Sequence, residues 1–270
     1  MKKNKKHRFR LLFSISMFFL GIYISFDYLS KYEGVLSDKY SEMFMNLSIP
    51  NYSSKDNNTE VVEHIDDTYL PRVYIYNSHP TEEYSSNLSF SFRPNVTMVN
   101  SILKSRFEKS GIDSYIEDRS VEDLLNHNNW NYASSYIASR IYLEEAKSKY
   151  SSLEYFIDVH RDSLRHDRTT VSFNNKNYAT LLFLIGLENP NYLDNIEFTE
   201  RIVSKINERY PGICKGIMQK GGPGNNGVYN QDFSKHLILL EVGGEENTIA
   251  EVLNSTLAFS ECFLEVINEG

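Results

Sequence analysis

The chain has 270 residues, of which 41% are hydrophobic, 13% aromatic and 24% charged. This size allows one sizeable domain with an extension or two small domains, and 13 Gly and 7 Pro exclude collagen-like and Pro-rich disordered classes. The net charge of -8 conceals an asymmetry, because six of the 28 Lys and Arg lie in the first ten residues. Residues 29–270 hold 22 basic and 35 acidic groups, which makes this part about -13. Since such a surface repels phosphates, we expect no nucleic-acid partner.

The N-terminal segment is typical of a membrane anchor. A basic tail at residues 1–10 precedes residues 11–28, which carry no charge between Leu11 and Phe26. That apolar stretch is just long enough to cross a bilayer, and the lysines before it place the tail in the cytoplasm. No small-residue cleavage site follows, which favours an uncleaved signal anchor over a removed signal peptide. We therefore expect a single-pass protein of the cell membrane with the rest of the chain outside.

Residues 29–70 have the composition of a stalk. They are polar and rich in Ser, Asn and Asp. Such a segment cannot bury enough apolar surface to fold alone, so it acts as a tether. The following residues, 71–270, form the expected folded domain.

In this domain, apolar runs alternate with longer amphipathic segments. That pattern predicts an α/β fold with a mostly parallel central sheet flanked by helices. The expected strands are 73–76, 155–160, 179–185 and 237–240, and the expected helices are 95–110, 132–150, 198–210 and 246–267.

Three of the expected strands lead into metal-ligand residue types, His79, His160 and Glu241. Side chains at the carboxyl ends of parallel strands converge at one sheet edge. Imidazoles and a carboxylate are the donors of a catalytic zinc site, and a further glutamate can take a proton from water there. Glu82 and Glu83 follow closely enough to reach the same metal. Glu241 is the strongest functional candidate, because a carboxylate ending a buried strand is costly unless it is paired or functional.

The glycine-rich segment 221–227 lacks the Gly-Lys-Ser/Thr ending of a phosphate-binding P-loop, so nucleotide binding is not expected. We expect a wall or lid close to a ligand, with Tyr229 and Asn230 lining a substrate groove. Arg161 either grips a substrate carboxylate in bidentate fashion or forms an internal ion pair with Asp162.

The chain has two cysteines, Cys214 and Cys262. They are too few for a disulfide framework or a Cys-only zinc site, and their spacing matches no redox motif. Two small buried thiols are the favoured interpretation, with a single disulfide as the alternative.

Five segments together resemble one family. They follow each other in its order and cover the chain from about residue 72 to residue 267, namely 73–82 (VYIYNSHPTE), 158–163 (DVHRDS), 186–192 (GLENPNY), 221–232 (GGPGNNGVYNQD) and 239–248 (LLEVGGEENT). The domain is similar to the stage II sporulation protein P family, cell-wall hydrolases within the zinc-dependent N-acetylmuramoyl-L-alanine amidase group. A membrane-anchored N-terminus and a variable stalk belong to the same pattern.

The resemblance implies an amidase-like (phosphorylase/hydrolase-like) fold and a Zn²⁺ cofactor. It implies His79, Glu82 and His160 as zinc ligands and Glu241 as the glutamate that activates water. Relatives in the wider amidase group take the carboxylate ligand from the helix after the first strand, but residues 94–104 contain no acid. Glu82 or Glu83 is left, and Glu82 aligns better with the Thr-Glu of the first motif.

The implied substrate is peptidoglycan, cut between N-acetylmuramic acid and the L-Ala of the stem peptide, with peptide crosslinks as a second target. The implied setting is sporulation and engulfment, beside a glycan-cleaving transglycosylase partner. Two alternatives remain. One is a catalytically impaired or partner-activated peptidoglycan-binding scaffold, which zinc content tests. The other is a metallopeptidase of carboxypeptidase type, which substrate profiling tests.

Overall fold

The structure is a computed structural model of the whole chain, and it describes residues 69–85 and 94–269. The chain divides into two compact units, 1–56 and 57–270, and the described residues all belong to the second. The expected tail, span and nearly all of the stalk lie outside the described residues. Within the described ranges, no helix is both long and apolar enough to cross a membrane.

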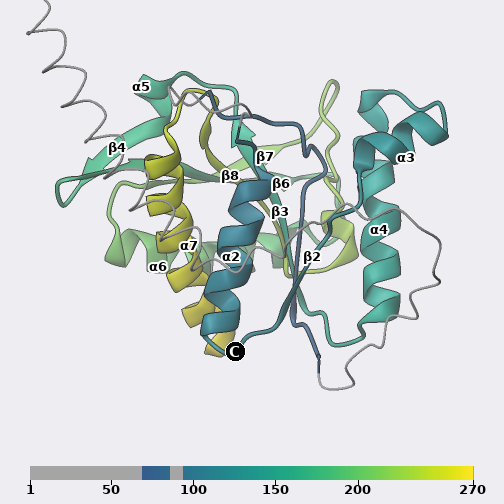
Figure 1. Cartoon of the computed structure of the whole chain (residues 1–270), viewed down its shortest axis with the longest axis horizontal. Helices are drawn as coiled ribbons and strands as arrows, with labels where there is room; N and C mark the ends of the chain where they lie inside the picture. Colours follow the sequence, from purple (N-terminus) through teal and green to yellow (C-terminus); the bar gives the residue numbers. More distant parts are fainter. Residues whose placement is uncertain (1–68, 86–93, 270) are drawn as a thin grey trace, which may run out of the picture. The chain divides into compact units, whose positions relative to one another are not determined.

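The described residues form a six-stranded sheet, a separate two-stranded hairpin and the helices around them (Figure 1). The sheet order is β2-β1-β3-β8-β6-β7, and β4 pairs with β5 in the hairpin. In chain order the elements are β1 (Val73–Tyr76), α2 (Thr97–Lys109), β2 (Ser114–Ile116), α3 (Val121–His127), the 3-10 helix η1 (Tyr132–Ser134), α4 (Ser135–Lys149), β3 (Tyr155–Asp162), α5 (His166–Thr169), β4 (Thr170–Phe173), β5 (Lys176–Ala179), β6 (Leu181–Gly186), α6 (Tyr192–Arg209), β7 (Cys214–Lys220), the 3-10 helix η2 (Gln231–Phe233), β8 (Leu237–Gly244) and α7 (Ile249–Asn268).

The central sheet is mostly parallel, which confirms the α/β prediction. β2, β1, β3 and β8 all pair in parallel, β6 runs antiparallel to β8, and β7 is parallel to β6. Tyr76 pairs with Asp158, and His160 pairs with Glu241. The carboxyl ends of β1, β3 and β8 therefore meet at one edge of the sheet.

The strands alternate between two faces of different chemistry. We call one the helix-packed face: Val73, Ile157 and Ile238 point to it and join one apolar core with residues of α2, α6 and α7. We call the other the site face: there Tyr74 and Phe156 pack with residues of α4. In Figure 1, α2, α6 and α7 gather on one side of the central strands and α3 and α4 on the other. The period of two in a strand separates the two sets.

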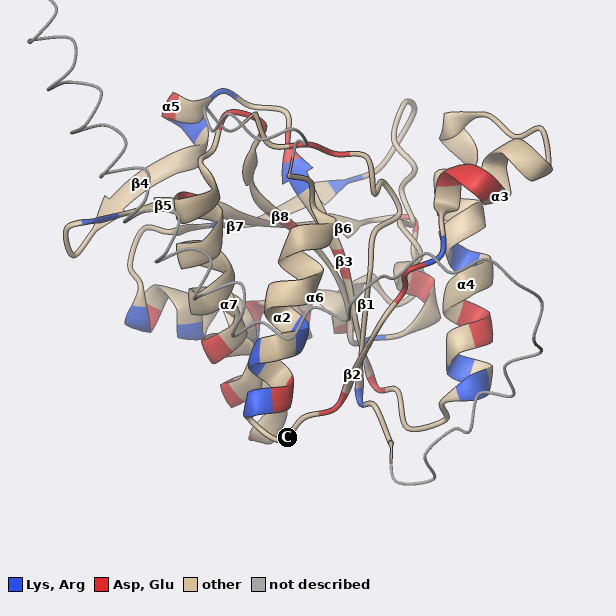
Figure 2. Ribbon diagram, viewed as in Figure 1, with Lys and Arg blue, Asp and Glu red and all other residues tan. Residues whose placement is uncertain are grey.

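Local sequence explains where the main helices lie. α7 begins with a capping box, in which Thr248 accepts from the N–H of Glu251 and the Glu251 carboxylate accepts from the N–H of Thr248. Ser120 caps α3 in the usual way by accepting from the N–H of Asp123. The charged residues of α2 and α4 form bands along these helices, whereas the strands are largely uncharged (Figure 2).

The expected elements are found with shifted ends. The helix expected at 198–210 begins earlier, at Tyr192, and the one expected at 132–150 starts with the short η1 before α4. Three elements of the sheet region were not expected: β2, β7 and the β4–β5 hairpin. The two cysteines, both within the described part, are free thiols, and burial raises their pKa to about 11 for Cys214 and about 12 for Cys262.

Candidate metal centre

The turn after β1 carries two of the expected ligands. The N–H of Glu82 donates to the carbonyl of His79 at 3.3 Å, so the two residues share one tight turn. His79 Nδ1 lies 3.8 Å from Glu82 Oε1, and the two side chains are 19% and 20% exposed. Both polar ends are thus near the surface but not freely solvated.

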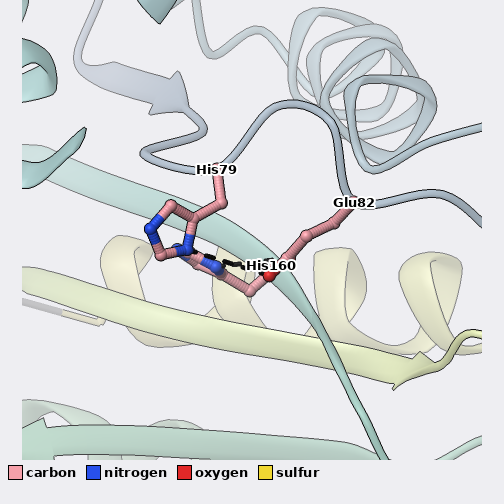
Figure 3. A group of neighbouring side chains, drawn as sticks. All are labelled: His79, Glu82 and His160. Carbon is pink, nitrogen blue, oxygen red and sulfur yellow. Dashed lines mark ion pairs between the residues drawn. The ribbon is translucent and has the colours of Figure 1, made fainter. Parts of the chain in front are cut away.

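The third expected ligand meets them from β3. His160 Nδ1 lies 3.3 Å from Glu82 Oε2, and the rings of His79 and His160 are 5.1 Å apart and perpendicular. One donor atom from each of His79, Glu82 and His160 lies within 4.8 Å of the others, and this is the one such group in the described ranges (Figure 3). Glu83 is not part of it. The structure therefore brings together the three residues that the resemblance implied.

The donor set fits zinc in its chemistry. Two imidazoles and one carboxylate form a common catalytic zinc set, with bonds of about 2.0–2.2 Å and an open fourth position. Donors around such an ion lie roughly 3.3 Å apart, so the observed cluster needs only a modest contraction. Two further observations agree: Glu82 and a second carboxylate, Asp158, face the same buried imidazole of His160, and Glu241 lies beside it.

The charges of the cluster are strongly coupled. Burial opposes ionisation of Glu82, yet its pKa is lowered because His160 and the N–H of Arg161 stabilise the carboxylate. Burial and the neighbouring His160 lower the pKa of His79. Burial also acts against a charged His160, but Asp158 and Glu82 outweigh it and raise the pKa of that imidazole. The cluster as a whole attracts positive charge.

Glu241 stands next to this cluster on β8, directly opposite His160 in the register. Its Oε2 is buried and has no hydrogen-bond partner among the described residues. Burial raises its pKa to about 7; His160 partly offsets this, while Glu82 adds to it. A carboxylate poised near neutral pH is suited to accept and return a proton.

Aromatic rings enclose the outer side of the centre. Tyr132 stacks on His79 with ring centroids 4.8 Å apart, and Tyr136 approaches edge-on at 5.2 Å. Tyr136 in turn contacts the ring of Tyr229 at 5.4 Å. Our sequence reasoning did not single out Tyr132 or Tyr136. Their only signal was their position at the start of the helix expected at 132–150.

The guanidinium of Arg161 joins two loops of the chain. Its backbone N–H donates to Glu82 Oε2 at 2.9 Å, and its Nε donates to the carbonyl of Glu83 at 2.7 Å. Its Nη2 lies 3.8 Å from the carboxylate of Glu245. The contact with Asp162 goes to the carbonyl oxygen, at 3.4 Å, rather than to the carboxylate. The side chain holds the turn of Glu82 in place, and its contact with substrate stays a prediction.

Tyr229 and Asn230 end the glycine-rich loop in a left-handed conformation, with φ of 52° and 57°. Both are 7% exposed. Asn230 Nδ2 donates to the carbonyl of Tyr136 and to Ser139 Oγ. The loop end is thus attached to α4, next to the aromatic wall around His79. Whether either side chain touches substrate stays a prediction.

These features define the class: an α/β protein with a candidate metal centre of two histidines and a glutamate at the carboxyl edge of its sheet. The model of the stage II sporulation protein P family matches residues 32–264. Stage II sporulation protein P of Bacillus subtilis (strain 168) is 34% identical over 202 residues, which cover 72% of this chain and 50% of that protein. The chain therefore belongs to the stage II sporulation protein P family, and it spans about half the length of this curated relative.

Two solved structures were also found. One is the CwlD amidase of Clostridioides difficile in complex with the GerS lipoprotein, with a TM-score of 0.46, 11% identity and coverage of 74% of this chain and 100% of that one. The other is Cwp6 of Clostridium difficile, with a TM-score of 0.43, 12% identity and coverage of 74% of this chain and 29% of that one.

Proposed function

We propose that this protein is a zinc-dependent peptidoglycan hydrolase that cleaves the amide between N-acetylmuramic acid and the L-Ala of the stem peptide, with peptide crosslinks as a second target. One observation carries the proposal: in a chain of this family, the unpartnered carboxylate of Glu241 lies beside the cluster of His79, Glu82 and His160. The proposed setting is wall remodelling during sporulation, with residues 11–28 as the membrane anchor and the catalytic domain outside the cytoplasm.

His79, Glu82 and His160 are the proposed zinc ligands. Burial keeps His79 neutral and its surroundings keep Glu82 ionised, which are the forms that bind a metal. When bound, zinc would supply a Lewis acid for the scissile carbonyl and lower the pKa of a water toward neutrality.

Glu241 is the proposed general base and acid. It takes a proton from the attacking water, whose oxygen forms a bond to the lactyl carbonyl carbon. The bond between that carbon and the amide nitrogen then breaks, and Glu241 returns the proton to the leaving nitrogen. The products are a free lactyl carboxylate on the glycan and a stem peptide with a free L-Ala amine. A pKa of about 7 lets one carboxyl group perform both transfers near neutral pH.

The proposed substrate contacts are Arg161, Tyr229 and Asn230. Arg161 lies at the turn of Glu82, and Tyr229 and Asn230 lie at the wall formed with α4. Because the Asn230 amide already donates to α4, its part is to hold this wall in place. The glycan strand and the stem peptide would then reach the centre along the rings of Tyr132 and Tyr136.

The test uses the full chain, purified in mild detergent, loaded with zinc and incubated with purified peptidoglycan. Mass spectrometry of the products is compared with an EDTA-treated sample and with the Glu241→Gln variant. Free stem peptides that begin with L-Ala, present only in the untreated wild type, would support the amidase. Peptides cut at other bonds would favour crosslink cleavage or a general metallopeptidase.

A negative result is informative if the glycan strands are cut beforehand by a transglycosylase, which stands for the proposed partner. If zinc is bound at one equivalent and no peptide is released, the amidase proposal fails for the isolated chain. The scaffold or partner-activated alternative then takes its place, because a partner that opens a groove can control an intact site.

A further inference from the structure

Behind the candidate metal centre, a second carboxylate is held in the interior. Asp158 lies on β3 two residues before His160, on the same face of the sheet, and its side chain is fully buried. Ser78, also fully buried, donates to it twice, from its N–H to Oδ1 at 2.9 Å and from its Oγ to Oδ2 at 2.8 Å. A buried carboxylate is costly, so this arrangement calls for a specific reason.

The partners of His160 determine which ring nitrogen carries the proton. Nε2 lies 3.1 Å from Asp158 Oδ1 and 2.9 Å from Ser78 Oγ. The carboxylate can only accept, and the proton of the Ser78 hydroxyl is already donated to Asp158. Nε2 must therefore be the donor. In the neutral ring this leaves a lone pair on Nδ1, the nitrogen that faces Glu82 at 3.3 Å.

We propose that Asp158, together with Ser78, is the positioning residue of the metal centre, which holds His160 in the Nε2–H tautomer and turns Nδ1 toward the ion. This inference rests on the proposed function. Carboxylates that accept from the outer nitrogen of a metal-bound histidine fix its orientation and raise its basicity, and losing one typically weakens metal binding 10–100-fold.

The strands deliver these groups to one place through their register. Tyr76, the last residue of β1, pairs with Asp158, so the chain leaves β1 beside that carboxylate and Ser78 follows two positions later. The Asn77 amide fixes the exit of the strand by donating to the carbonyl of Val159 at 2.6 Å. The support is therefore built by the two parallel strands rather than by a mobile side chain.

The decisive variant is Asp158→Asn, which keeps the shape of the side chain but places an N–H where Asp158 accepts from Ser78. The hydroxyl of Ser78 is then released to donate toward Nε2, which favours the opposite tautomer. Asp232→Asn is the matched control, because Asp232 makes the same chemical change on η2 at an ion pair with Arg140. Each full-length variant is freed of metal with a chelator, and its thermal midpoint is recorded before metal is added.

Two readouts follow that loss of stability alone does not change. The first is the zinc dissociation constant, measured by competition with a chromophoric chelator. The second is the visible absorption of the cobalt(II) form, which reports the number and geometry of its ligands. We expect Asp158→Asn to bind zinc 10–100-fold more weakly and to alter the cobalt spectrum, while Asp232→Asn matches the wild type.

An unchanged zinc constant and cobalt spectrum in folded Asp158→Asn would overturn the inference. If that variant does not fold, Ser78→Ala decides: a smaller but measurable loss of zinc affinity supports the role, and no loss rejects it. A wild type that binds no zinc would instead refute the proposed function itself, so the two failures are distinguishable.

Discussion

The two faces of the central sheet are built from the same strands but serve different ends. On β3, Ile157 and Val159 point to the helix-packed face, where they join one continuous apolar core. Phe156, Asp158 and His160 point to the site face, where polar groups replace apolar ones toward the carboxyl end. On β8 the alternation is the same, with Leu240 on one face and Glu241 on the other.

The difference teaches that stability and chemistry are divided here by residue parity. Apolar burial on the helix-packed face contributes roughly 25 cal/mol per Å², whereas buried carboxylates on the site face cost free energy unless they are paired. A change on one face should therefore leave the property of the other nearly intact. Each of the following experiments can break or sharpen this division.

The largest effect is expected from Glu241→Gln on the site face. The amide cannot take up a proton, so the rate of peptidoglycan hydrolysis should fall by about 10²–10⁴-fold. Stability should stay the same or rise slightly, because the lost charge had no hydrogen-bond partner at Oε2 among the described residues. Initial rates of peptide release and the urea midpoint measure both properties, and near-normal rates would rule out Glu241 as the base.

The next effect concerns the helix-packed face. Phe263 on α7 is fully buried and contacts the rings of Phe107, Tyr155 and Phe259. Phe263→Ala should lower the free energy of unfolding by about 3–5 kcal/mol. Urea unfolding measures this, with Phe263→Leu as the milder control. Zinc affinity of the folded variant should not change, and a large drop would show that the two faces are coupled.

A smaller effect is expected at Glu251, an acid on α7 that serves the fold. Burial opposes its ionisation, but Asn247, the N–H of Thr248 and His166 outweigh burial and lower its pKa. A lowered pKa in the folded state adds stability above the ordinary value of 4.5, and this stability is lost as the pH falls through the folded value.

Glu251→Gln should accordingly cost about 1 kcal/mol near neutral pH and progressively less in acid. Urea unfolding of both proteins over a pH series checks this. A difference that grows as the pH falls would contradict the assigned sign.

The smallest effect is expected for the thiols. Burial raises the pKa of Cys262 to about 12 and that of Cys214 to about 11, so almost no thiolate exists at neutral pH. Iodoacetamide should label the native chain far more slowly than the urea-unfolded chain, as followed by mass spectrometry over time. Equal rates would show that the helix-packed face opens readily.

Much of the site could be predicted because its signals are local. The apolar runs before His79, His160 and Glu241 predict strands, and parallel strands bring their ends together. The choice between Glu82 and Glu83 could not be made from spacing alone. It depends on the turn in which the N–H of Glu82 donates to His79, a conformation that the residue pattern did not specify.

Other parts depend on contacts between distant segments. Asp158 looked like an ordinary member of a strand motif, since its partner Ser78 lies 80 residues away and only the register joins them. β7 escaped notice because it is a largely polar strand at the sheet edge, where exposed side chains blur the apolar pattern. Sequence reasoning is weakest wherever a residue's neighbours are far along the chain.

The placement of the three donors has a consequence for folding. His79 and Glu82 share one turn after β1, while His160 comes from β3, so a bound ion would act as a cross-link between two distant segments. Closing a loop of about 80 residues restricts the unfolded chain much as a disulfide of that span does. The folded domain should therefore resist heat better as free zinc rises, and chelation should lower its melting temperature even when no substrate is present.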